Sequence, residues 1–201
     1  PAFLKEDFLF PYNQGHAFVE YLYAQGGWSA VDQAYRQPPV SSEQILHPEL
    51  YPAELPQEID LPDLGAILGH EWIEIDRGVM GEWYTFLILA QGVDASGRID
   101  PEQAQEAAAG WGGDAFVVSH NPNDQSRIMF LVSEWDTETD AQEFEQALIA
   151  SLRGRFGIES AGTWANLDGQ YSLVRQGKRT IWLFSTDAET VSALWDMLTN
   201  P

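Results

Sequence analysis

The feature that most constrains the fold is a strand–strand–helix pattern that occurs twice in the second half of the chain. The runs "RIMFLVS" (127–133) and "RTIWLFS" (179–185) correspond residue for residue, and each lies between a preceding β-prone run and a following helical segment. The residues "NPND" and Gly177-Lys178 favour hairpin turns before these runs. Because two units are too few for a solenoid, we expect them to share one antiparallel sheet, with both helices on one face.

The first third of the chain has the residue pattern of helices. Asn13 is a suitable N-cap for a helix with apolar residues on one face, and Gly26-Gly27 is expected to end it. A second helix is expected to follow, with Ser29 and Asp32 in capping-box spacing and Pro38-Pro39 at its end.

The proline-rich segment "PPVSSEQILHPELYP" (38–52) predicts a short helix over residues 42–47. Ser41 and Gln44 have the spacing that satisfies the free backbone donors at a helix start, and Pro48 stops the helix. We interpret this segment first as structural, because its capping residues and prolines account for most of its sequence.

The middle of the chain predicts one strand and two further helices. "HEWIEIDRG" (70–78) alternates apolar and charged residues as a strand does, "MGEWYTFLILAQG" (80–92) indicates a buried helix, and Asp100-Pro101 begins an Ala-rich helix. The predicted fold class is therefore α+β. A mainly helical region over 1–110 would be followed by an α+β region over 111–201, and we expect the two to pack together as one body.

Composition limits the function classes. The chain is 44% apolar and carries eight Trp, seven Tyr and ten Phe, which is enough for a large aromatic core. Its formal charge of −21 disfavours nucleic acid and anionic lipid as partners. The apolar run "WYTFLILA" (83–90) is too short to span a bilayer, so we expect no direct membrane insertion. With no cysteine, the chain has no disulfide, thiol nucleophile or thiolate metal site.

Glu43 and His47 are the candidate metal ligands of this sequence. They are four residues apart and would share one face of the short helix. A catalytic zinc ion needs three protein ligands, and no third one lies nearby in the sequence, although Asp32 or His16 could approach through folding. We therefore predict that the pair does not bind metal and that the short helix is structural.

The remaining motifs do not form a catalytic constellation. "HEWIE" has Glu74 where a metalloprotease helix has its second His, and "VDASGRIDPEQ" lacks the first Asp and last Glu of a calcium loop. "DTETD" (136–140) is typical of a helix N-terminus, and "GWGGD" (110–114) of a tight bend with a buried Trp111. We accordingly expect no catalytic residue and no cofactor in this chain.

Several segments taken in order resemble a family of uncharacterised secreted or lipid-anchored bacterial proteins. They are "FPYNQGHAFVEYLYAQGGWSAVDQAY", "PPVSSEQILHPELY", "MGEW", "AAAGWGGD" and "WDTETDAQEF", which together span about residues 8 to 150. Members of that family carry an amino-terminal zincin-like half with a His-Glu-x-x-His helix. The present sequence does not contain this motif, so no catalytic residue is carried over from the family.

The resemblance implies a non-catalytic accessory or substrate-cleft region of an exported zincin-like protein. Its partner would be the amino-terminal part of the same parent protein, and its location would be extracytoplasmic, with a lipid anchor upstream of residue 1. The alternative is a stand-alone extracytoplasmic module that binds a peptide, a glycan or a cation on an acidic, aromatic surface.

Overall fold

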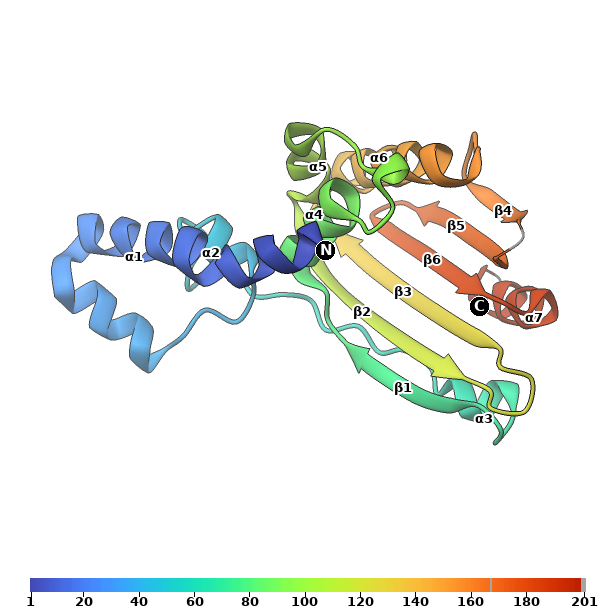
Figure 1. The fold of residues 1–201 in the computed structure, drawn as a ribbon. Coiled ribbons are helices and arrows are strands. Elements are labelled where there is room, and N and C mark those ends of the chain that lie inside the picture. The colour runs from blue at the N-terminus through green and yellow to red at the C-terminus, as the bar shows by residue number, and fades with distance from the viewer. Residues whose placement is uncertain (167, 200–201) are drawn as a thin grey trace.

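The computed structural model describes residues 1–166 and 168–199, which form one antiparallel sheet with helices on both faces and a helical arm (Figure 1). The strand order is β1-β2-β3-β6-β5-β4. The strands are β1 (Ile73–Gly78), β2 (Trp111–His120), β3 (Arg127–Trp135), β4 (Gly162–Ala165), β5 (Gln170–Gln176) and β6 (Arg179–Ser185). The helices are α1 (Ala2–Arg36), α2 (Glu43–Leu46), α3 (Leu64–Leu68), α4 (Gly81–Gln91), the 3-10 turn η1 (Ala95–Gly97), α5 (Pro101–Ala108), α6 (Glu138–Phe156) and α7 (Ala188–Thr199).

The α+β class and the repeated strand–strand–helix unit are confirmed. Hairpin β2–β3 leads into α6 and hairpin β5–β6 leads into α7, and β3 pairs with β6 at the centre of the sheet. Helix α6 begins with the capping box of Thr137 and Asp140, so Glu138 and Asp140 of "DTETD" do belong to a helix N-terminus, whereas Asp136 precedes the cap.

The expectation that both repeat helices share one face of the sheet is wrong. Helix α6 packs on the face that carries Leu131, whereas α7 packs on the face that carries Leu183. These two leucines are equivalent in the repeat, but the residue paired with Leu131 across the strands is Trp182. Directly paired residues lie on the same face of the sheet, and successive residues of a strand alternate between the two faces. Because the pairing is offset by one residue from the repeat, equivalent residues of the two units lie on opposite faces.

The first helix differs from the sequence prediction in where it begins. Helix α1 starts at Ala2 and continues through Asn13, so Asn13 is not an N-cap. The first turns are held by tertiary contacts, because the ring of Phe10 packs 4.7 Å from that of Trp83 on α4. Gly26 and Gly27 have non-helical backbone angles and kink the helix where its end was predicted.

The other predicted elements are present close to their expected positions. Helix α2 occupies most of the range 42–47, and "HEWIEIDRG" contains the edge strand β1. Asp100 caps α5 by accepting hydrogen bonds from the amides of Glu102 and Gln103. In the described part of the chain, no helix has the length and apolarity that crossing a membrane requires.

Candidate functional site

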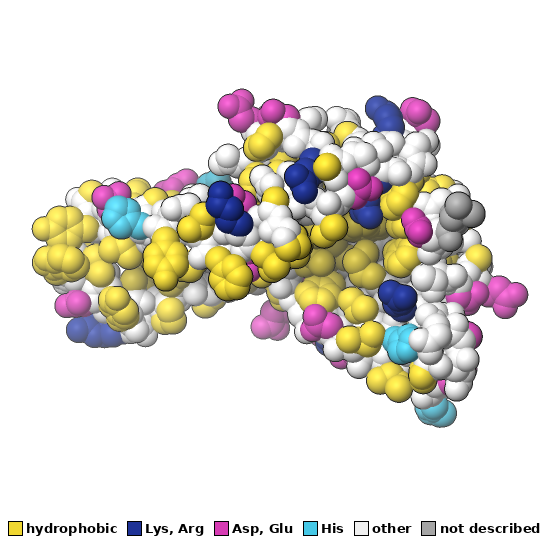
Figure 2. All heavy atoms as spheres, in the orientation of Figure 1, with side chains coloured by type: hydrophobic (Ala, Val, Ile, Leu, Met, Phe, Trp, Pro, Cys, Tyr) yellow, Lys and Arg dark blue, Asp and Glu magenta, His cyan; other side chains and the backbone are white. Residues whose placement is uncertain are grey.

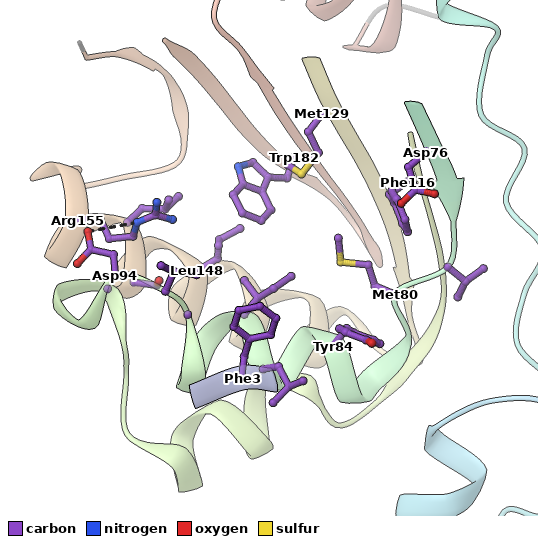
Figure 3. A pocket seen from close by; sticks show the side chains of 18 residues that line it. Phe3, Asp76, Met80, Tyr84, Asp94, Phe116, Met129, Leu148, Arg155 and Trp182 are labelled. Atoms are coloured by element: carbon purple, nitrogen blue, oxygen red, sulfur yellow. Dashed lines mark ion pairs between the residues drawn. The ribbon is translucent and has the colours of Figure 1, made fainter. Parts of the chain in front are cut away.

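An apolar cavity opens on the α6 face of the sheet. Its volume is about 670 Å³, which lies within the range of small-molecule sites. Phe116 on β2, Met129 on β3 and Trp182 on β6 form the floor, and Figure 3 shows the Trp182 indole projecting into the space. Figure 2 shows the apolar hollow beside the point at which the arm joins the body.

Three helices form the walls of this cavity. Met80 and Tyr84 come from the start of α4, Leu148 comes from α6, and Phe3 comes from the first turn of α1 (Figure 3). The hydroxyl of Tyr84 donates a hydrogen bond of 3.0 Å to Asp7, which ties the first turns of α1 to α4. The arm is therefore part of the cavity wall.

One end of the cavity is charged. The guanidinium of Arg155 lies 3.8 Å from the carboxylate of Asp94 and 4.6 Å from the centre of the Phe156 ring. Asp94 also caps η1 by accepting hydrogen bonds from the amide and hydroxyl of Ser96, and these bonds lower its pKa. The cavity thus combines a mainly apolar interior with one polar end, as small-molecule sites usually do.

A buried aspartate fixes the α4 wall. The Asp114 carboxylate accepts hydrogen bonds from the amides of Met80 and Gly81 and from the indole nitrogen of Trp111, at 2.7, 2.8 and 2.7 Å respectively. Burial raises the pKa of Asp114, and these three donors oppose the increase. Trp111 is buried, as predicted for "GWGGD", but its segment starts strand β2 with a bulge.

The two candidate metal ligands lie in a second polar cluster, on the α2 side of α4. Glu43 is only 3% exposed, and the oxygens of Glu43, Glu54 and Asp136 lie within 4.8 Å of one another. Burial and the charges of the neighbouring acids, Glu82 first among them, raise the pKa of Glu43 to about 8. Burial also raises the pKa of Asp136.

His47 points to a different partner. Its Nε2 atom lies 2.9 Å from Oε1 of Glu82, the buried first-turn glutamate of α4. This hydrogen bond raises the pKa of His47, against the effect of burial. The other oxygen of Glu82, Oε2, is buried and has no hydrogen-bond partner among the described residues.

The distant residues considered as further ligands do not join this cluster. His16 is exposed on the arm, 3.5 Å from Glu20, and Asp32 lies on an exposed part of the same helix. Glu54 and Glu82 did not stand out in the sequence, and Asp136 was considered only within "DTETD", because no spacing rule connects these residues with Glu43. The one available signal was the acidic content of the segments that contain them.

The comparisons with known proteins identify one family. A family model described as "Domain of unknown function (DUF8575)" matches residues 71–195, which include the whole sheet and most of α7. All cavity-lining residues except Phe3 lie within this range. No curated protein and no solved structure matches the chain. With its match covering well over half of the sequence, the chain belongs to the DUF8575 family.

Proposed function

We propose that this chain is a non-catalytic binding module whose cavity takes a small, mainly apolar molecule. The observation that carries the proposal is the 670 Å³ cavity itself, which opens on one face of the sheet and is lined mainly by aromatic, Met, Leu and Val side chains. Removing an apolar ligand from water against such walls contributes about 25 cal/mol per Å² of buried apolar surface. The Asp94–Arg155 pair would orient a polar group of the ligand at one end.

The position of the cavity supports this function. Its floor belongs to the central strands, and its α4 wall is fixed through Asp114, so most of the site is formed in advance by the fold. Among the described residues, its lining contains no His and no Ser–His or paired-carboxylate arrangement of the kind that supports nucleophilic or acid–base catalysis. These residues favour binding over catalysis.

A neutral apolar dye tests the proposal directly. N-phenyl-1-naphthylamine fluoresces strongly in apolar surroundings, and we expect the full chain to bind it saturably at one site. Met129→Trp adds volume to the floor of the cavity and should weaken dye binding at least tenfold. Leu55→Trp is the matched control, because Leu55 is 67% exposed and does not line the cavity.

A second variant keeps the test independent of core packing. Val79 lies at the mouth of the cavity and is 62% exposed, so Val79→Trp should obstruct entry without disturbing the fold. Equal dye affinity in the wild type, Met129→Trp and Val79→Trp would refute the cavity as the binding site, as would the absence of saturable binding. A competition panel of small apolar molecules would then define the ligand class.

On the sequence resemblance, we further propose that this module is an accessory part of a larger exported, lipid-anchored zincin-like protein. Support comes from the ordered segments shared with that family over about residues 8 to 150. The reading frame upstream of Pro1 tests this context. A lipobox cysteine and a His-Glu-x-x-His motif there would support it, whereas a signal peptide joined directly to residue 1 would favour a stand-alone extracytoplasmic module.

A further inference from the structure

We propose that Glu43, Glu54 and Asp136 form a Ca²⁺-binding site that links the segment 37–58 to the sheet domain. The three residues come from α2, from the turn after it, and from the turn between β3 and α6. This acidic site is separate from the apolar cavity, and none of its three residues lines that cavity.

The spacing of the oxygens suits calcium. One oxygen from each residue can be chosen so that all three lie within 4.8 Å of one another. Two oxygens bound to the same Ca²⁺ ion lie at most about 5 Å apart, which is twice a Ca–O distance of about 2.4 Å. Mg²⁺ demands near-ideal octahedral geometry at about 2.0–2.1 Å, whereas Ca²⁺ accepts the more variable arrangement that carboxylates from three separate segments provide. Carboxylates are ligands that hard cations prefer.

Buried carboxylate groups without partners provide a second observation. Glu82 is 2% exposed, and its Oε2 atom has no hydrogen-bond partner in the described part of the chain. Glu82 lies beside the cluster, because its Oε1 atom is 2.9 Å from His47 at the end of α2, the helix that begins with Glu43, and its charge helps to raise the pKa of Glu43. A buried carboxylate oxygen without a donor is costly, and a cation nearby removes that cost.

The positive groups around the cluster are already engaged. His47 is hydrogen-bonded to Oε1 of Glu82, and the Lys178 ammonium donates a hydrogen bond to the backbone carbonyl of Asp136. Of the four carboxylates, Glu82 therefore has the hydrogen bond from His47, and the hydrogen bond from Lys178 goes to a backbone oxygen and not to a carboxylate. In this arrangement His47 positions Glu82 and is not a ligand of the ion.

A bound ion would add to the hydrogen bonds that already join this segment to the sheet domain. Gln57 donates one backbone hydrogen bond of 2.7 Å to Gly112, and Ser42 accepts one of 3.2 Å from the amide of Trp83. Because Glu43 and Glu54 precede residue 71, the ion would join residues outside the matched family range to Asp136 within it. Calcium would thereby hold the segment 37–58 against the sheet domain.

Calorimetric titration of the full chain, after treatment with a chelator, tests the site. We expect one Ca²⁺ ion per chain and at least tenfold weaker binding of Mg²⁺. Glu43→Gln should weaken Ca²⁺ binding at least tenfold, and so should Asp136→Asn, a change at a more accessible residue that spares the buried interior. Glu106→Gln is the matched control, because it removes one charge from an exposed site on α5.

Limited proteolysis supplies an independent readout. Calcium should slow cleavage within residues 37–58 in the wild type and in Glu106→Gln, but not in Asp136→Asn. The proposal is overturned if Ca²⁺ does not bind, if Mg²⁺ or Zn²⁺ binds more tightly than Ca²⁺, or if Asp136→Asn binds Ca²⁺ as well as the control does.

Discussion

Ionisation of Glu43 should make the metal-free protein less stable as the pH rises. The pKa of Glu43 is raised from 4.5 to about 8, so between these values the folded state binds a proton that the unfolded state has released. The free energy of unfolding therefore falls as the pH increases through this window. Glu43→Gln keeps the shape of the side chain and removes the ionisation, so the variant should lose this part of the pH dependence.

The size of the effect follows from the two pKa values. Between pH 5.5 and 7.5, a group with pKa values of 4.5 and 8 changes the free energy of unfolding by about 2.5 kcal/mol at most. Water screens the charges of the partly exposed Asp136 and Glu54. We therefore expect the pH dependence due to Glu43 to change the free energy of unfolding by about 1–2 kcal/mol between pH 5.5 and 7.5. His47 contributes in the same direction, because its raised pKa also favours a proton in the folded state. The difference between wild type and variant isolates Glu43.

Urea unfolding at several pH values in EDTA measures this difference, since linear extrapolation gives the free energy of unfolding at each pH. We expect Glu43→Gln to be more stable than the wild type at pH 7.5, with the advantage shrinking towards pH 5. Adding Ca²⁺ at pH 7.5 should narrow the gap by stabilising the wild type alone. If the two stability curves run parallel from pH 5 to 8, Glu43 titrates normally and the reasoning is refuted.

Three further changes test the elements that hold the sites. Asp114→Ala leaves three buried donors unpaired and should cost about 3 kcal/mol in urea unfolding, whereas Asp63→Ala, at the exposed cap of α3, should cost about 1 kcal/mol. Gly113→Ala places a Cβ atom within 2.4 Å of the Gln57 carbonyl and should lower the free energy of unfolding by about 2 kcal/mol. If the variant is as stable as the wild type, the backbone at Gln57 can move away from the new Cβ atom without cost. Ser41→Ala removes the acceptor for the Gln44 amide and should cost about 1 kcal/mol, without changing dye binding in the cavity.

The fold class could be predicted because its signals are local. Turn residues, helix caps and apolar periodicity indicated hairpins, α5 and α6 within a few residues of their observed positions. The start of α1 could not be predicted in the same way, since the contact of Phe10 with Trp83 joins residues far apart in the sequence. Local propensity there favoured a later start, and tertiary packing decided the outcome.

The candidate sites depended on information that no single segment contains. Glu43 stood out through its spacing to His47, yet in the structure His47 turns to Glu82, and Glu43 meets Glu54 and Asp136. Each of these contacts is set by where α4 and the β3–α6 turn lie in the folded chain. The sequence could therefore predict one member of the cluster but not its partners.

The one-residue offset between the repeat units also explains why a cavity exists. If equivalent residues of β3 and β6 paired directly, Leu131 and Leu183 would share a face, both repeat helices would pack on it, and α7 would cover the strands beside α6. Because Leu131 pairs with Trp182, α7 packs on the opposite face. Helices α4 and α6 then leave a strip of the central strands uncovered between them, and Phe116, Met129 and Trp182 line it. The cavity thus follows from strand register, which neither unit specifies alone.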